Sequence, residues 1–177
     1  MGEWAGHHTI TPVLQHSSPP FTFITESADE TIEAGRALAR FLDEGDMVGL
    51  VGELGSGKTW FTKGIALGLG VPSEVVVTSP SFALVHEYAA RVVLYHMDVY
   101  RLETPAEFVS AGLEEYLCGK AVTVMEWADR WPDLLPGQRV TVVFTIMDDH
   151  CRKIALTGAH PRAVEIIESF MKEVGKE

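Results

Sequence analysis

The strongest constraint on what this chain can fold into is a glycine-rich segment of eight residues. It reads Gly52, Glu53, Leu54, Gly55, Ser56, Gly57, Lys58 and Thr59. The segment matches the phosphate-binding pattern G-x-x-x-x-G-K-[ST] at every fixed position. An apolar run over residues 46–51 precedes it, and residues 58–69 have a helical pattern, so it is predicted to connect a buried strand to a helix.

This strand–loop–helix arrangement predicts a nucleotide-phosphate site. Glycines let several backbone N–H groups point at one anion, and the positive end of the following helix adds to the attraction. In this pattern the lysine, Lys58, is predicted to reach the terminal phosphates. The hydroxyl of Thr59 is predicted to ligate Mg²⁺.

Two further apolar runs end in an acidic residue. Asp98 follows residues 92–97, and Glu126 follows residues 122–125. Mg²⁺ takes few carboxylates and keeps several waters, so Asp98 is predicted to hold it through water. Glu126 is predicted to reach the same cleft, as a ligand on the metal side or to orient the attacking water. The competing interpretation is an ordinary strand-end acid at each position.

A polar segment lies between the phosphate loop and the run that ends at Asp98. It contains Thr78, Ser79 and Ser81, with a proline between the two serines. Hydroxyl groups held by a proline suit a switch segment that senses the terminal phosphate of a nucleotide. The alternative is an ordinary polar turn.

The remaining pattern predicts a single α/β domain over residues 21–177, with a mixed β-sheet flanked by helices as in P-loop nucleotide triphosphatases. Residues 1–20 are predicted to form a flexible extension. Two antiparallel pairs are expected, 83–90 with 92–97 and 139–147 with 151–157. The other strands are predicted at 21–26, 46–51 and 121–125, and the helices from Ser27 to Gly45 and over 58–69, 105–117 and 161–174.

Composition limits the partners of this domain. The 177 residues hold 14 Lys and Arg against 25 Asp and Glu, a net charge of −11. Such a domain repels nucleic acid at long range, so any contact with nucleic acid is expected through a partner. The longest nearly unbroken apolar run, residues 140–147, is far shorter than the roughly 18 residues of a membrane span. With no signal-peptide pattern in residues 1–20, a cytoplasmic protein with no membrane contact is expected.

Several motifs occur together along almost the whole folded part of the chain. After the phosphate loop come S-P-S-F-A-L-V-H-E-Y at residues 79–88, Y-H-M-D-V-Y-R-L at residues 95–102, and the pair Glu126 and Trp127. The pattern H-x-D-x-Y-R-L followed by E-W is far more specific than the loop alone. In this order the motifs resemble the TsaE (formerly YjeE) family, the small bacterial ATPases of tRNA threonylcarbamoyladenosine (t6A) synthesis.

The resemblance implies an ATPase that uses ATP and Mg²⁺. It places residues 52–59 on the phosphates, and Thr31 beside the base. It implies Thr59, Asp98 and Glu126 at the metal, with Lys58, Asp98 and Glu126 in catalysis. Thr78, Ser79 and Ser81 match the first switch of the family, and Trp127 lies in the second. Trp60 departs from the family pattern, in which a second threonine is common.

The resemblance also implies partners. It indicates that the protein binds the heterodimer of TsaD and TsaB, which its ATP hydrolysis resets, and that it meets tRNA only through them. The lone subunit is expected to hydrolyse ATP slowly, because partner contact completes the switch segments. From the residues alone, a small-molecule kinase and a nucleotide-gated binding module without turnover stay open. A kinase needs lid arginines, however, and no Arg occurs between Arg40 and Arg91.

Overall fold

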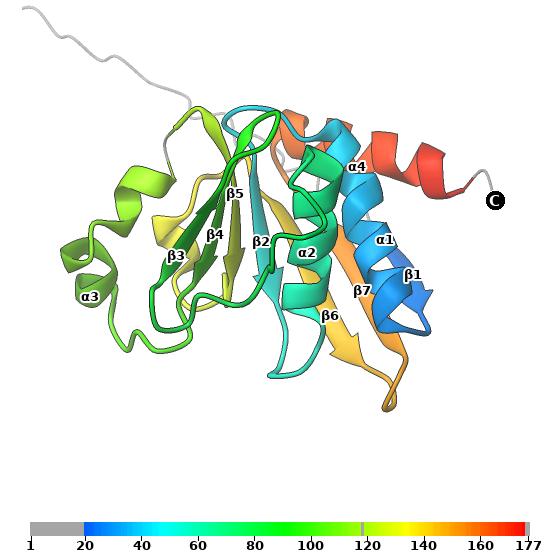
Figure 1. The fold of residues 1–177 in the computed structure, drawn as a ribbon, viewed down its shortest axis with the longest axis horizontal. Helices are drawn as coiled ribbons and strands as arrows, with labels where there is room; N and C mark the ends of the chain where they lie inside the picture. Colours follow the sequence, from blue (N-terminus) through cyan, green and yellow to red (C-terminus); the bar gives the residue numbers. More distant parts are fainter. Residues whose placement is uncertain (1–19, 118, 176–177) are drawn as a thin grey trace, which may run out of the picture.

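The chain folds around one seven-stranded mixed sheet (Figure 1), seen in a computed structural model that describes residues 20–117 and 119–175. The strands, in chain order, are β1 (Phe21–Thr25), β2 (Met47–Val51), β3 (Val85–Tyr88), β4 (Val93–Asp98), β5 (Ala121–Glu126), β6 (Val140–Ile146) and β7 (Arg152–Thr157). Their spatial order is β1-β7-β6-β2-β5-β4-β3. The four central strands, β6, β2, β5 and β4, are parallel, whereas β1, β7 and β3 pair antiparallel at the two sides. The predicted mixed sheet with two antiparallel pairs is confirmed, and the predicted extension lies outside the described residues except for Pro20.

Within residues 20–117 and 119–175, four α-helices and three short 3₁₀ helices accompany the sheet. They are α1 (Ala28–Leu38), η1 (Ala39–Phe41), α2 (Lys58–Leu69), α3 (Pro105–Ser110), η2 (Leu113–Tyr116), η3 (Pro132–Leu134) and α4 (Pro161–Val174). Helices α2 and α4 have the bounds that the sequence predicts. No helix among the described residues is both long enough and apolar enough to cross a membrane.

The prediction of one helix over residues 105–117 is wrong. Helix α3 ends at Ser110, and Gly112 adopts a left-handed conformation with φ 70° before the chain continues as η2. A left-handed glycine just after the last turn satisfies free carbonyl groups and ends a helix. Here the N–H of Gly112 donates to the carbonyl oxygen of Val109 at 2.9 Å.

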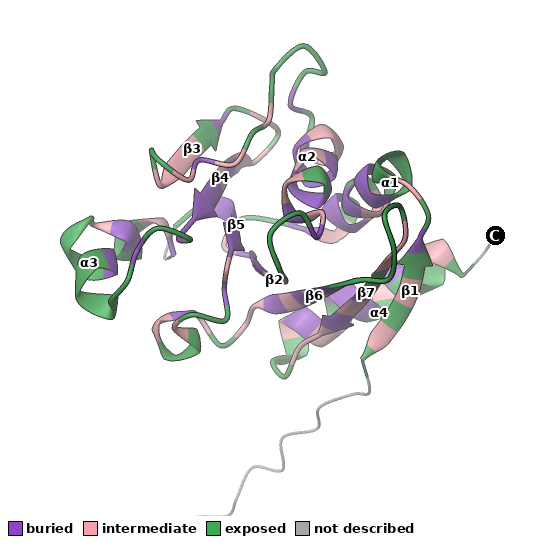
Figure 2. Cartoon of the chain, turned by 90° about the horizontal axis from the view of Figure 1, so that it is seen from below, coloured by how far each residue is buried: buried purple, intermediate pink, exposed green. Residues whose placement is uncertain are grey.

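The core consists of two clusters of buried side chains. The first joins α1, α2 and α4 to the sheet, and the second joins α3, η2 and the segment after β5 to it. Strand β5 serves both, because Val122 and Val124 belong to the first cluster and Met125 to the second. Alternate residues of a strand face opposite sides of a sheet, so the clusters cover opposite faces. Every residue of β5 is buried, and Figure 2 shows burial concentrated in the central strands.

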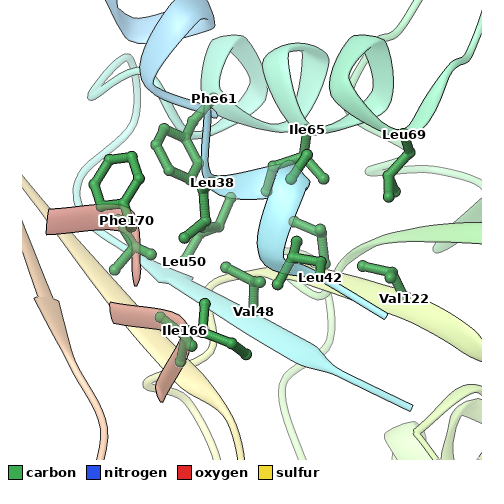
Figure 3. Packing of buried hydrophobic residues seen from close by; sticks show 14 of the residues in the cluster. Leu38, Leu42, Val48, Leu50, Phe61, Ile65, Leu69, Val122, Ile166 and Phe170 are labelled. Atoms are coloured by element: carbon green, nitrogen blue, oxygen red, sulfur yellow. The ribbon is translucent and has the colours of Figure 1, made fainter. Parts of the chain in front are cut away.

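Helices α1 and α2 pack unusually close together, through glycine. A Cβ atom on Gly64 would collide with the carbonyl oxygen of Ile32, and one on Gly35 with that of Phe61. A Cβ on Gly68 would lie 2.6 Å from the Cβ of Ala39. Glycine thus lets the two backbones touch, while Phe61, Ile65 and Leu69 of α2 point into the first cluster (Figure 3). This contact fixes where α2, and therefore the loop before it, stands on the sheet.

Replacing Gly64 with alanine is expected to lower the free energy of unfolding by about 2 kcal/mol, because overpacking against fixed backbone outweighs the gain in helix propensity. Urea denaturation followed by circular dichroism measures the change. The control is Gly137→Ala, whose Cβ would have no atom within 4 Å. We expect this variant to match the parent within about 0.5 kcal/mol. Equal stability of the two variants would contradict the close-packing interpretation.

Candidate phosphate-binding site

The candidate site residues meet at one edge of the sheet. Strands β2, β5 and β4 run parallel, so their carboxyl ends share that edge. In the strand register Asp98 is paired with Glu126, and Glu126 with Leu50. The loop after β2 closes over the same edge and leads into α2 (Figure 1). In open parallel sheets, ligands bind at this end of the strands.

Glycine is required at two points of the loop. Gly52 has φ 152°, and a Cβ there would lie 2.7 Å from Ser56 Oγ and 2.8 Å from the carbonyl oxygen of Phe144. Gly57, the residue before α2, has φ 104°. Residues that carry a side chain rarely adopt such φ angles. Glycine at these two positions therefore lets the loop close tightly and present the first N–H groups of α2.

The side chain of Lys58 is buried within this loop. Its Nζ atom donates to the carbonyl oxygens of Gly52 at 2.7 Å and Glu53 at 2.8 Å. The same atom lies 4.1 Å from the centre of the Trp127 ring. Burial lowers the pKa of Lys58, and the nearby carboxylates Glu126, Asp98 and Asp129 oppose that shift. The ammonium group is therefore held by the loop carbonyl oxygens and feels the charge of these carboxylates.

Both predicted acids are buried and hydrogen-bonded. Glu126 Oε1 accepts a hydrogen bond from Thr59 Oγ1 at 2.8 Å and lies 2.9 Å from His96 Nε2. Asp98 accepts one from the hydroxyl of Ser79 and another from the backbone N–H of Tyr100, at 2.8 Å. Hydroxyl and carboxylate oxygens are the ligands that Mg²⁺ prefers. The donor set of Thr59, Asp98 and Glu126 thus fits a magnesium ion.

A cavity of about 380 Å³ joins these groups. Its lining includes the loop from Leu54 onward, Ser79, Ser81, Asp98, Tyr100, Arg101, Glu126 and Trp127. Of the predicted switch residues, Ser79, Ser81 and Trp127 line the cavity, whereas Thr78 does not. Gly52 and Glu53 also lie outside its lining and face Lys58 through their carbonyl oxygens.

A second cavity, of about 170 Å³, adjoins the other side of the loop. It shares Gly55, Gly57 and Trp60 with the first cavity and is also lined by Thr31. The Thr31 hydroxyl is occupied within the protein, because it lies 2.9 Å from Thr25 Oγ1 and donates to the carbonyl oxygen of Ser27. Thr31 therefore lines this cavity beside Gly57 with a hydroxyl group that is already hydrogen-bonded within the protein.

Sequence reasoning assigned no site role to several residues that line or contact the two cavities. Arg101 lines the first cavity, with its guanidinium 3.8 Å from the centre of the Phe82 ring. Arg152, from the hairpin of β6 and β7, donates to the carbonyl oxygen of Gly55 at 3.3 Å. His96 contacts Glu126 from the strand interior. The H-x-D pattern could have pointed to His96, whereas no local pattern brings Arg152 to the loop.

Fold and site together define a P-loop α/β protein. The crystal structure of YdiB from Bacillus subtilis is similar, with a TM-score of 0.75 and 34% sequence identity, covering 88% of this chain and 96% of that one. The family model described as "Threonylcarbamoyl adenosine biosynthesis protein TsaE" matches residues 25–154.

Curated relatives agree with the family model. A "tRNA threonylcarbamoyladenosine biosynthesis protein TsaE" from Treponema pallidum is 42% identical over 75% of this chain and 97% of its own length. The protein of the same name from Bacillus subtilis is 39% identical, over 84% and 92%. The chain therefore belongs to the TsaE family of tRNA t6A biosynthesis, and the family resemblance seen in the sequence is confirmed.

Proposed function

We propose that this protein binds ATP with Mg²⁺ and hydrolyses it as the ATPase component of tRNA t6A biosynthesis. The observation that carries the proposal is the contact of Thr59 Oγ1 with Glu126 Oε1, at 2.8 Å, beside the phosphate loop. It joins the threonine of the loop motif to an acid on a neighbouring strand. Asp98 is paired with that acid in the strand register.

Each residue has a distinct role in this proposal. Lys58 binds the terminal phosphates, and Thr59 and Asp98 hold the ion. Glu126 orients the attacking water and is also a ligand on the metal side. When bound, Mg²⁺ neutralises charge on the phosphates. Ser79, which donates to Asp98, couples the first switch segment to this carboxylate, and Ser81 and Trp127 are the other switch contacts at the cavity.

We place the base of the nucleotide in the second cavity. Its lining includes Gly55, Gly57, Thr31 and Trp60, but neither Asp98 nor Glu126. Trp60 also lines the first cavity, so its ring stands where phosphate and base portions would meet. Aromatic rings stack on nucleobases of any sequence.

The proposed partners are TsaD and TsaB, through which the protein would meet tRNA in the cytoplasm. A net charge of −11 disfavours direct binding of tRNA, which supports this division of work. Leu54 and Phe82, at the rim of the loop and in the switch segment, are 76% and 83% exposed. Exposed apolar side chains beside a nucleotide site suit a protein partner that responds to the nucleotide.

Replacing Lys58 with alanine is expected to abolish ATP binding. Replacing Glu126 with glutamine should leave ATP binding intact and reduce hydrolysis by about 100-fold or more, because a water-orienting carboxylate is lost. Calorimetry measures binding, and release of labelled phosphate in the presence of TsaD and TsaB measures turnover. Transfer of phosphate to a small molecule would instead support a kinase. ATP binding without phosphate release would support a binding module.

Mg²⁺ is expected to raise the affinity of the parent for ATP. In the variant Thr59→Val this gain should be smaller by about 10-fold or more, since a metal ligand is removed. The matched control is Thr62→Val on the same helix. The Thr62 hydroxyl donates to the carbonyl oxygen of Lys58 at 3.0 Å and lines neither cavity. Titrations of ATP with and without Mg²⁺ test both variants. Equal loss of magnesium dependence in the two would argue against Thr59 as a ligand.

The variant Trp60→Ala should weaken ATP binding by about 10-fold, because base stacking is lost. Trp60→Phe keeps an aromatic face and should stay close to the parent. Inorganic triphosphate, which lacks a base, should bind all three proteins equally. If triphosphate binding fell together with ATP binding, Trp60 would act on the phosphates, and the base would not be assigned to the second cavity.

A further inference from the structure

One histidine is buried beside the proposed catalytic acid. His96 lies in β4 with no exposed surface, and its Nε2 atom is 2.9 Å from Glu126 Oε1. The other ring nitrogen, Nδ1, has no hydrogen-bond partner among residues 20–117 and 119–175, and no other buried side-chain nitrogen or oxygen in that part of the chain lacks one. Carboxylate oxygens accept hydrogen bonds, so in this contact the N–H of Nε2 donates a hydrogen bond to Glu126 Oε1.

Folding alone does not account for a histidine at this position. Alternate residues place Leu94 and His96 on one face of β4, beside Val122 and Val124 of β5 in the strand register. Leu94, Val122 and Val124 all belong to the first apolar cluster. An apolar side chain would fill this space without such a cost. Histidine buries a nitrogen that has no hydrogen-bond partner, and this is unfavourable for folding. The polar ring therefore needs a reason outside packing, and its one hydrogen bond goes to Glu126.

Two donors act on the same oxygen of Glu126. Thr59 Oγ1 donates from the first turn of α2, and His96 Nε2 from the interior of the sheet. The Thr59 hydroxyl is also the proposed magnesium ligand, so its hydrogen bond to Glu126 is tied to metal binding. His96 supplies a contact from a buried strand that does not depend on the metal. When two donors hold one oxygen of a carboxylate in this way, the direction in which the other oxygen points is fixed as well.

We infer that His96 is a positioning residue for ATP hydrolysis. By donating from Nε2 to Glu126 Oε1, it fixes the orientation in which Glu126 meets the attacking water. This inference rests on the proposed role of Glu126. Reactive groups must be held within a narrow geometry, so loss of a supporting hydrogen bond slows the reaction without weakening substrate binding.

Three substitutions separate the hydrogen bond from the packing. Glutamine can place its amide nitrogen close to the position of Nε2, methionine has nearly the same length and shape without a donor, and asparagine has the donor but not the reach. Compared with the parent, His96→Met and His96→Asn should lower kcat about 10-fold or more, while KM for ATP stays within about 2-fold. His96→Gln should keep kcat within about 3-fold of the parent. Steady-state hydrolysis of labelled ATP in the presence of TsaD and TsaB measures kcat and KM, and thermal unfolding checks the fold.

The same substitution in a Glu126→Gln background tests whether His96 acts through Glu126. Residues that act as a unit are not additive, so His96→Met should cause no further loss of kcat there. An equal loss in both backgrounds would overturn the inference, and so would equal loss in the glutamine and methionine variants. If His96→Met were fully active while Glu126→Gln was inactive, the inference about His96 would be overturned and the proposed function would stand. A parent protein that hydrolyses no ATP would overturn the proposed function as well.

Discussion

The backbone contact between α1 and α2 positions the helix that carries the lysine and threonine of the phosphate loop. At Gly35 and Gly64 the two helices approach so closely that any side chain would strike a carbonyl oxygen of the other helix. Helix α2 is therefore held at one height above the sheet, and its first residue is the loop lysine, Lys58. The same contact brings Thr31 of α1 next to Gly57, where an added Cβ would lie 3.6 Å from the Thr31 methyl group. Packing between the two helices thus places Thr31 beside the loop, where Thr31 and Gly57 line the second cavity together.

The second organising feature is the row of polar groups at the carboxyl edge of β4 and β5. Both strands are mostly buried up to their last residues, so Asp98 and Glu126 lie at the end of the buried sheet. Each is satisfied by donors from another element, Ser79 for Asp98 and Thr59 for Glu126. Buried carboxylates are tolerated only when they are hydrogen-bonded or paired with charge. The hydrogen bonds that satisfy these acids also connect Ser79 and the first turn of α2 to them.

Local signals in the sequence were sufficient for most of the fold and for the centre of the site. The loop motif and the acids that end two apolar runs are each readable within a few residues, and the structure has a helix or strand at each predicted place. Gly112 was misjudged because a left-handed glycine and an ordinary helical glycine look alike in a periodic pattern. The contact of Arg152 with Gly55 spans almost a hundred residues, so only the assembled sheet reveals it. Likewise, the buried nitrogen of His96 becomes informative only when its neighbours are known.

Backbone strain is found beside both acids. Leu84 and Trp127 have φ values of 66° and 65°, and no other described residue except glycine has a positive φ. For a non-glycine residue this conformation costs roughly 1–2 kcal/mol, so surrounding contacts must offset it. The Leu84 N–H donates to the carbonyl oxygen of Pro80, and its own carbonyl oxygen accepts from the N–H of Asp98. Trp127 follows Glu126 directly, and its ring contacts the Lys58 ammonium. Each strained residue therefore contacts one charged residue of the candidate site, Leu84 through its carbonyl oxygen to Asp98 and Trp127 through its ring to Lys58, so these contacts offset part of the cost of the strained backbone.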